Sequence, residues 1–301
     1  TEKVRRAAAE LGYRPNPIAR AMITGKSRIV GLVLAYLDNQ FYPLALKRLS
    51  AALQAQSYHV LVFLASNQSQ DIARVVQDLL DYRVDGIITA SVALSNDMTD
   101  RCADAGIPVV MFNRGQLGGG ISSVTSANRT GGRKVSEHLL AAGHTRIAHI
   151  AGWAGSSTGH DRRAGFLEGL SDAGHTPFDV IDGMYDRPTA AAATRDLMNR
   201  PTPPDAIFVG NDHMAFAVLD TLRSDLGLCV PQDVAVIGYD DVPLAAWPSY
   251  NLSTVRQPLN RMVEATVETL LAQMADPARP AQKIEIDGPL ILRGTTKGMH
   301  P

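Results

Sequence analysis

Residues 155–159 read GSSTG and match the GxSxG pattern in which a serine is the nucleophile of α/β hydrolases. That chemistry needs the serine in a tight strand-to-helix turn, with an acid and then a histidine at the ends of later strands. Here several residues separate the predicted strand Ile147–Ala151 from Ser157, and no later strand end presents a convincing histidine. A GxSxG hydrolase is therefore a minor alternative.

Two further patterns could support catalysis but lack the required context. The GKS triplet at residues 25–27 resembles the end of a phosphate-binding loop, but the first glycine of that motif falls on Arg20, and the triplet precedes a strand. Asp240 and Asp241 could form a carboxylate pair, but adjacent residues of an extended segment point in opposite directions. We therefore predict no catalytic residues and no enzyme activity.

Histidines and cysteines give no sign of a metal site. The eight histidines show no ligand spacing, and we interpret His138, His144 and His149 as structural or surface residues. Cys102 and Cys229 are far apart and form no CxxC pair. The sequence predicts no metal, no cofactor and no disulfide framework.

Polar and aromatic residues instead gather at the ends of the predicted strands. Aromatic rings offer flat apolar faces, while amide, guanidinium and carboxylate groups offer hydrogen bonds. This combination suits a small hydroxylated ligand whose ring stacks and whose hydroxyls are held by several polar groups. The predicted binding residues are Phe41, Tyr42, Asn113, Arg114, Thr158, Arg162, Tyr185, Asn211 and Asp240.

The elements that would position these residues alternate between strand and helix from Ile29 onward. Apolar runs without alternation predict strands that are buried on both faces. The pattern predicts an α/β fold with two doubly wound parallel sheets, in which ligands sit beyond the carboxyl ends of the strands. Predicted strands are 29–34, 60–64, 86–89, 108–112, 147–151, 179–182, 206–209 and 234–238; predicted helices are near 44–56, 72–82, 96–105, 133–142, 163–173, 190–199 and 214–224.

Charge is distributed unevenly along the 301 residues. Residues 1–28 contain seven basic and two acidic residues, whereas the remainder contains 22 basic and 28 acidic ones. A basic end on an acidic body is typical of a segment that binds nucleic acid. No apolar run reaches the roughly 18 residues of a membrane span, and no signal-peptide pattern opens the chain. We expect a soluble cytoplasmic protein.

The basic segment contains two predicted helices. Glu2–Leu11 forms the first, which Gly12 ends. Asn16 and Pro17 begin the second, which Gly25 ends after about eight residues, fewer than the roughly 12–15 that persist alone in water. Such a helix orders only against a partner, and its basic side chains favour an anionic one. An ordinary solvated linker between two domains is the alternative.

Several long blocks identify a family. They include LGYRPNPIARAM at 11–22, GIPVVMFNR at 106–114, DRRAGFLEGL at 161–170, PDAIFVGNDHMAFAVL at 204–219 and VPQDVAVIGYDDVPLA at 230–245. Together, and in this order, they resemble the LacI/GalR family of bacterial transcription regulators over essentially the whole chain.

The resemblance implies a homodimer with a helix-turn-helix headpiece, a hinge helix and a core like that of periplasmic sugar-binding proteins. Residues 1–27 would be a remnant of the headpiece with the hinge helix, the recognition helix preceding Thr1. The core would divide into an N-subdomain of about 28–126 and 258–285 and a C-subdomain of about 127–257 and 286–301. The implied contacts to operator DNA are Arg14, Asn16, Ala19, Arg20, Met22 and Lys26, with Met22 in place of a leucine that wedges between base steps.

The resemblance also bears on the ligand. Arg162 matches the effector-binding arginine of the family, and Asp240 matches the aspartate that holds ligand hydroxyls. Ser156 stands where a purine-responsive member has arginine, and Ala127 stands where many members have aspartate. A purine is therefore disfavoured, and a sugar, sugar acid or polyol is expected, with a lean toward an acid because Arg114 and Arg162 tolerate a carboxylate. A solute-binding protein that serves a transporter is the alternative of a different class.

Overall fold

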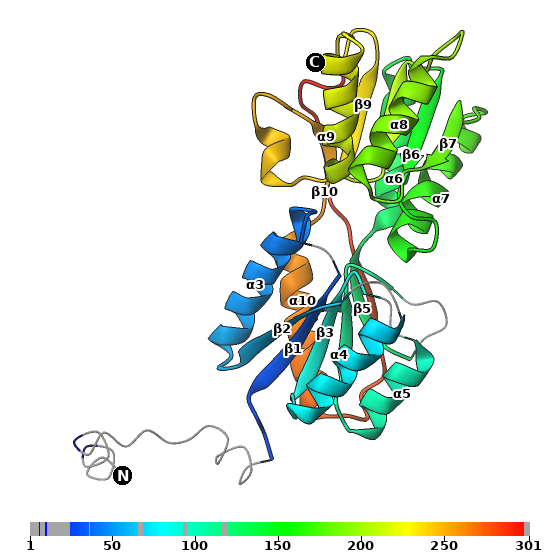
Figure 1. The fold of residues 1–301 in the computed structure, drawn as a ribbon. Helices are drawn as coiled ribbons and strands as arrows, with labels where there is room; N and C mark the ends of the chain where they lie inside the picture. Colours follow the sequence, from blue (N-terminus) through cyan, green and yellow to red (C-terminus); the bar gives the residue numbers. More distant parts are fainter. Residues whose placement is uncertain are drawn as a thin grey trace.

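The computed structural model describes residues 6, 10, 25–35, 37–65, 69–92, 95–115 and 120–297. Within these residues the chain forms two lobes, each built around a six-stranded sheet with helices on both faces (Figure 1). The neighbouring strands pair in parallel, except that β10 (Ser253–Arg256) pairs antiparallel with the edge strand β12 (Leu290–Ile291). The predicted architecture of two doubly wound sheets is confirmed.

The N-terminal lobe contains β1 Ile29–Leu34, α3 Phe41–Ala55, β2 His59–Leu64, α4 Ser69–Asp81, β3 Gly86–Ala90, α5 Asn96–Asp104, β4 Val109–Phe112, β5 Ser122–Ser126, α10 Leu259–Ala275 and β11 Lys283–Ile286. The strand order is β11-β5-β4-β3-β1-β2. Leu32 of β1 packs with residues of α3 and α10, whereas Val33 packs on the opposite face with residues of α4 and α5. Alternating apolar residues of one strand thus join both helical layers to the sheet.

The C-terminal lobe contains α6 Asn128–Ala141, β6 Ile147–Ala151, α7 Ser157–Asp172, β7 Asp179–Asp182, α8 Arg187–Met198, β8 Ala206–Val209, α9 Asp212–Asp220, β9 Ala235–Asp240, β10 Ser253–Arg256 and β12. The strand order is β12-β10-β9-β8-β6-β7. Helices α6 and α7 cover one face, and α8 and α9 cover the other.

Helices α6 and α7 approach each other more closely than ordinary side chains allow. A Cβ added at Gly165 would lie 1.8 Å from the carbonyl oxygen of Arg129, and one added at Gly132 would lie 2.1 Å from that of Arg162. Glycine is required at both positions because backbone atoms, not movable side chains, occupy the space. The close crossing fixes the position of α7 against the sheet.

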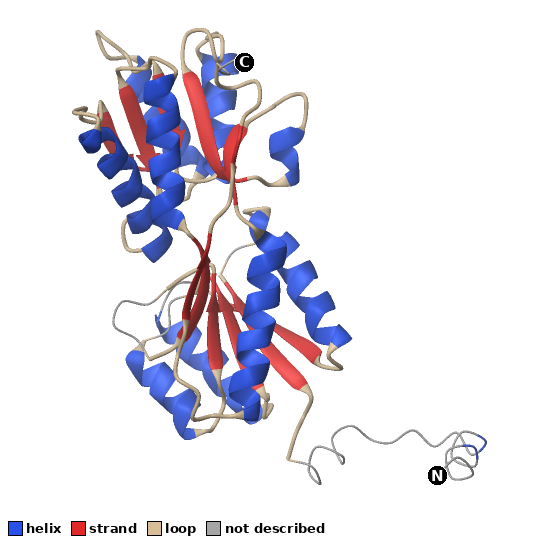
Figure 2. Ribbon diagram, turned by 180° about the vertical axis from the view of Figure 1, so that it is seen from behind, coloured by secondary structure: helices blue, strands red, loops and turns tan. Residues whose placement is uncertain are grey.

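The chain passes between the lobes three times, after β5, after β10 and after β11 (Figure 2). As a result, α10 and β11 belong to the first lobe although they follow all elements of the second lobe except β12 in sequence. These crossings fall close to residues 126, 257 and 286, where the predicted subdomain bounds lie. We retain those bounds as a proposal for two subdomains that move as separate bodies.

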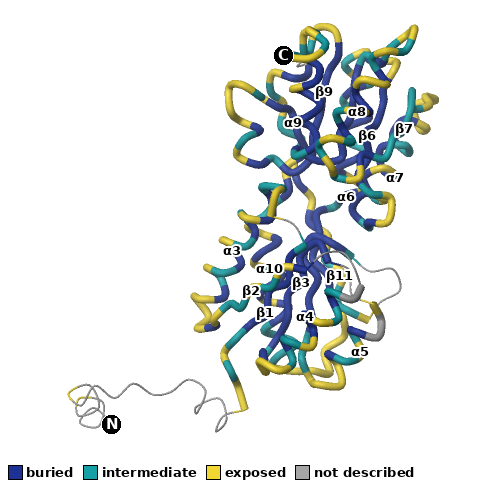
Figure 3. Tube along the Cα trace, viewed as in Figure 1, coloured by how far each residue is buried: buried dark blue, intermediate teal, exposed yellow. Residues whose placement is uncertain are grey.

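The predicted strands and helices from residue 29 onward are present, with ends displaced by up to six residues. One expectation was wrong. The strand β2 was expected to be buried on both faces, but it forms a sheet edge and is half-exposed, as is the edge strand β7 (Figure 3). Val62 and Leu64 of β2 are 42% and 60% exposed, which fits the position of β2 at the sheet edge.

Most of the residues proposed to contact DNA lie outside the part of the chain that the structure describes. These are Arg14, Asn16, Ala19, Arg20 and Met22, together with most of the predicted helix Glu2–Leu11 and the predicted hinge helix. Lys26 is described and lies three residues before β1. Within the described residues, no helix is both long and apolar enough to cross a membrane.

Candidate ligand-binding cavity

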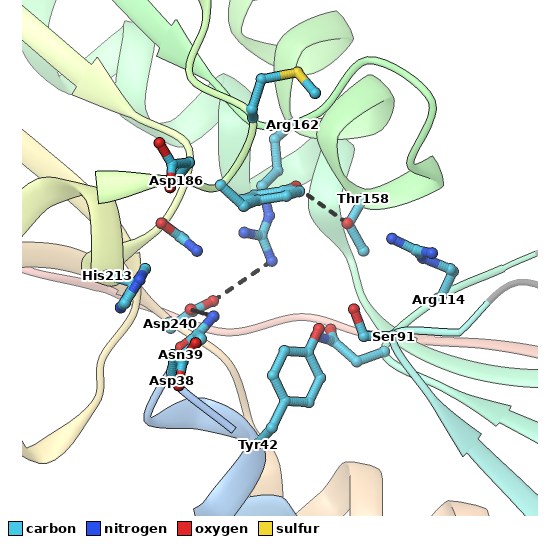
Figure 4. Close-up of a pocket in the computed structure, with 14 residues that line it drawn as sticks. Asp38, Asn39, Tyr42, Ser91, Arg114, Thr158, Arg162, Asp186, His213 and Asp240 are labelled. Carbon is cyan, nitrogen blue, oxygen red and sulfur yellow. Dashed lines mark hydrogen bonds and ion pairs between the residues drawn. The ribbon is translucent and has the colours of Figure 1, made fainter. Parts of the chain in front are cut away.

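A cavity of about 210 Å³ lies between the two lobes, where the carboxyl ends of both sheets meet (Figure 4). Segments that follow β1, β3 and β4 line it from the N-terminal lobe, and segments that follow β6, β7, β8 and β9 line it from the C-terminal lobe. The lining residues are Asp38, Asn39, Tyr42, Ser91, Asn113, Arg114, Thr158, Arg162, Met184, Tyr185, Asp186, Asn211, His213 and Asp240.

The structure brings eight of the nine predicted binding residues into this lining. Phe41 is not among them: its ring packs 5.5 Å from that of Tyr42 and 6.2 Å from that of Phe112, within the core. Six lining residues were not predicted to bind. Each lies within a few residues of the carboxyl end of a strand, where ligands of parallel sheets bind, so this signal could have identified them. They are Asp38, Asn39, Ser91, Met184, Asp186 and His213.

Arg162 extends from α7 into the middle of the cavity (Figure 4). Its Nε donates to Asn128 Oδ1 at 2.9 Å, and its Nη1 donates to the carbonyl oxygen of Gly210 at 2.6 Å. The guanidinium lies 3.7 Å from the centre of the Tyr239 ring, and Nη2 lies 3.6 Å from Asp240 Oδ1. These four partners hold the Arg162 side chain in one position, and the side chain is only 3% exposed.

Asp240 brings a carboxylate into the cavity from the end of β9. Its φ of +131° and the φ of +56° at Asp241 are conformations that L-residues rarely adopt. Backbone strain of this kind is concentrated at functional sites. Asp240 Oδ1 accepts a hydrogen bond from Gln257 Nε2 at 2.6 Å, and Oδ2 accepts from Asn39 Nδ2 at 3.5 Å. Burial raises the pKa of Asp240 above its usual value, and the charge of Arg162 acts against that rise.

Asp212 supports this turn from below the cavity surface. It begins α9, and its Oδ1 accepts from Thr254 Oγ1 at 2.6 Å while its Oδ2 accepts from the backbone N–H of Val242 at 3.0 Å. Burial, with a smaller contribution from the charge of Asp240, raises the pKa of Asp212 to about 8. Asp212 therefore ties the chain that follows Asp240 to β10.

Asp241 is not among the residues that line the cavity, and its side chain has partners of its own. It forms ion pairs with Arg256 Nε at 2.6 Å and with Arg293 Nη2 at 2.6 Å, and neither of these described arginines forms an ion pair with Asp240. The two adjacent carboxylates thus have separate partners and separate roles.

Among the hydrogen bonds that join the lobes, two lie at opposite sides of the cavity. Asn39 of the N-terminal lobe donates to Asp240, and the backbone N–H of Gly115 donates to Ser157 Oγ at 3.0 Å. Ser157 is the first residue of α7 and lies six positions beyond the end of β6, so it does not occupy a tight strand-to-helix turn. No described histidine is hydrogen-bonded to it. The GxSxG segment therefore lacks the geometry of a hydrolase elbow.

The histidines singled out in the sequence have packing roles where they are described in detail. His149 of β6 stacks 4.4 Å from Phe208 and donates from Nδ1 to the carbonyl oxygen of Phe208 at 2.9 Å. Burial lowers the pKa of His149 to about 4, so the ring is neutral. The described ranges contain no group of three or more histidine, cysteine, aspartate or glutamate residues arranged to hold a metal ion.

Two parallel-sheet lobes, three crossings and a polar cavity between strand ends define a two-lobed ligand-binding protein. A model of the periplasmic binding protein-like domain family matches residues 136–296. The HTH-type transcriptional repressor PurR of Vibrio vulnificus is 28% identical over 99% of this chain and 90% of its own. The ribose operon repressor of Escherichia coli is 28% identical over 98% of this chain and 90% of its own.

Solved structures give the same result. A LacI transcriptional regulator from a Rhodococcus species is 30% identical, with a TM-score of 0.81 over 89% of this chain and 98% of that one. The lac repressor dimer bound to operator is 25% identical, with a TM-score of 0.87 over 99% of this chain and 90% of that one. The chain belongs to the periplasmic binding protein-like family and, within it, to the LacI/GalR family of transcription regulators.

Proposed function

We propose that this protein is a transcriptional repressor whose affinity for operator DNA is controlled by a small hydroxylated effector, a sugar or sugar acid, bound between the lobes. The observation that carries the proposal is the polar cavity lined by strand ends of both lobes. Its relatives are repressors, which supports a homodimer acting on DNA and does not favour a transport-linked solute-binding protein. We further propose a non-enzymatic role in the cytoplasm.

The cavity residues include groups that can bind hydroxyls and aromatic rings that can stack against a carbon skeleton. Asp240 and Asn211 would bind effector hydroxyls, since a carboxylate accepts and an amide both donates and accepts. Tyr42 and Tyr185 would present ring faces to the carbon skeleton of the effector. The remaining proposed contacts are Asn113, Arg114, Thr158 and Arg162, with Phe41 supporting Tyr42 from the core.

Effector binding would act through the relative orientation of the lobes. A ligand that touches both lobes favours one orientation, and it shifts the equilibrium only by its differential affinity for the two states. The hinge segments that precede β1 in two protomers would change their spacing with that rotation. Because the coupling between the sites is reciprocal, operator must alter effector affinity by the same factor as effector alters operator affinity.

The DNA contacts would come from Arg14, Asn16, Ala19, Arg20, Met22 and Lys26. Met22→Ala in the full-length protein should weaken specific operator binding roughly 10–100-fold, the value of one buried apolar side chain. Met22→Leu, which restores an apolar wedge, should bind like the unmodified protein. Equal affinities of all three in a fluorescence-anisotropy titration would exclude the wedge role of Met22.

A thermal-shift screen against sugars, sugar acids, polyols and nucleosides tests the effector half of the proposal. A ligand at 100 times its dissociation constant adds roughly 2.7 kcal/mol, which raises the melting temperature of 301 residues by about 4 °C. The hit should then change operator affinity in the full-length protein. A ligand that binds without any effect on operator affinity would contradict control by the effector.

A further inference from the structure

Arg114 brings to the cavity a cation that has no carboxylate partner among the described residues. Arg114 follows β4 and is only 5% exposed. Among the described residues, no carboxylate forms an ion pair with it and no acceptor is hydrogen-bonded to its side chain. The contact that the structure does show is with the ring of Trp153, whose centre lies 5.7 Å from the guanidinium carbon.

Arg162, the other arginine of the cavity, has a guanidinium group whose hydrogen-bond donors and charge are both partnered. Its guanidinium is similarly buried but reaches Asn128, Gly210 and Asp240. A buried ion costs free energy unless a charge or hydrogen bonds compensate it. Arg114 has no such partner among the described residues, and its side chain points into the cavity (Figure 4).

The surroundings of Arg114 add donors and no negative charge. Thr158 lies beside it at the amino-terminal end of α7, a helix of 16 residues (Figure 4). Partial positive charge accumulates at that end of a helix and favours an anion. The bond from Gly115 N–H to Ser157 Oγ holds the Arg114 segment against this helix end.

The acidic residues of the cavity gather at its other side. Asp38, Asp186 and Asp240 line that side together with His213, and they face Arg114 across the cavity (Figure 4). The cavity therefore has one end that attracts an anion and another end that accepts hydrogen bonds from hydroxyls. At about 210 Å³ it is smaller than the roughly 300–1,000 Å³ of sites for drug-sized ligands, so it suits a compound with a single sugar ring.

We propose that the effector is an anionic monosaccharide derivative whose carboxylate or phosphate group binds Arg114, Thr158 and the amino-terminal end of α7, while its hydroxyls bind at the Asp240 side. The inference rests on the proposed function and adds the charge of the effector. Arg114 is then the residue that selects an acid over the neutral sugar of the same stereochemistry.

Matched ligands test the proposal by isothermal titration calorimetry. The panel holds D-glucose and D-galactose, their uronic and aldonic acids, and their 6-phosphates. An acid or phosphate should bind roughly 10–150-fold more tightly than its neutral sugar, the range expected for hydrogen bonds to a charged group. Comparing the acid arm with the phosphate arm identifies which anion the site takes.

Three variants separate the role of Arg114 from a structural one. Arg114→Met should abolish the preference for the anion without lowering the melting temperature of the protein alone, because the guanidinium forms no hydrogen bond or ion pair within the described residues. Arg114→Lys should keep part of the preference, since it keeps the charge but not the planar fork. Arg163→Met, which removes an exposed arginine one position beyond Arg162, should change neither property.

Two results would overturn the inference. If a neutral sugar binds as tightly as its acid and phosphate, and Arg114→Met leaves that ratio unchanged, the effector is not anionic while the proposed function stands. If neither this panel nor the broader thermal-shift screen of sugars, sugar acids, polyols and nucleosides yields a ligand of the unmodified protein, the proposed sugar-responsive function is wrong as well. A fall in melting temperature for Arg114→Met would assign the side chain to the fold.

Discussion

Replacing Asp240 with asparagine tests whether the strained turn at the end of β9 serves the ligand or the fold. Asparagine has nearly the same shape, tolerates positive φ and can still accept from Gln257 Nε2, which lies 2.6 Å from Asp240 Oδ1. The substitution removes the negative charge. Arg162 keeps its bonds to Asn128 and Gly210 and loses a carboxylate 3.6 Å away.

The expected effects on binding and on stability have opposite signs. A hydrogen bond to a charged group contributes about 1.5–3 kcal/mol and a neutral one about 0.5–1.5, so Asp240→Asn should weaken effector binding by about 1–2 kcal/mol. That difference is roughly 5–30-fold in the dissociation constant. Because burial raises the pKa of Asp240, folding disfavours its charged form, and the ligand-free variant should unfold no more easily than the unmodified protein.

Calorimetry of the effector and urea unfolding of the ligand-free protein measure the two quantities. Asp241→Asn is the matched control on the adjacent residue: it breaks contacts with Arg256 and Arg293 outside the cavity. The control should leave effector affinity unchanged and lower the free energy of unfolding by about 1–3 kcal/mol. Unchanged affinity together with a loss of stability in Asp240→Asn would refute the assignment of Asp240 to the ligand.

Two further predictions concern the C-terminal lobe. Gly165→Ala should lower the free energy of unfolding by at least about 1–3 kcal/mol, since its Cβ would lie 1.8 Å from the carbonyl oxygen of Arg129; an unchanged urea midpoint would contradict the close crossing of α6 and α7. The folded pKa of His149, about 4, lies below its usual value of 6.5, so the unfolded chain binds the extra proton and stability falls as pH drops through that interval. Between pH 7 and pH 5 this group should remove about 2 kcal/mol, and His149→Asn should lose correspondingly less stability over the same interval than the unmodified protein.

The sequence predicts this fold well where strands are continuous apolar runs. Ile29–Leu34, Ile147–Ala151 and Ala206–Val209 are strands with the predicted ends because both of their faces are covered by helices. The cavity follows from the same reasoning, since parallel strands direct their carboxyl ends to a common edge. What a strand pattern does not reveal is its place in the sheet, and β2 was therefore expected to be buried on both faces.

Buried strands that carry polar side chains cannot be predicted from continuous apolar runs. β5 has the sequence SSVTS, yet it is fully buried, because distant groups satisfy its hydroxyls: Ser122 Oγ accepts from Gln273 Nε2 at 2.8 Å and from Gln282 N–H at 3.0 Å. In β10, Thr254 donates to Asp212. No local pattern shows these partners. Helix α10 is different: its helical periodicity can be read locally, but its return to the first lobe follows only from the family resemblance.

The three crossings set the order in which this protein is completed on the ribosome. The first lobe is completed by α10 and by the strand β11. The second lobe is completed by β12 and by the backbone hydrogen bond between Thr295 and Val236, so neither lobe can be complete until about the last forty residues have been made. At about 5–20 residues per second, β5 stays without its neighbour β11 for roughly 10–30 s after it is made. A chain released early lacks an intact edge in both lobes, so a repressor able to sense its effector exists only after synthesis has reached the end of the core.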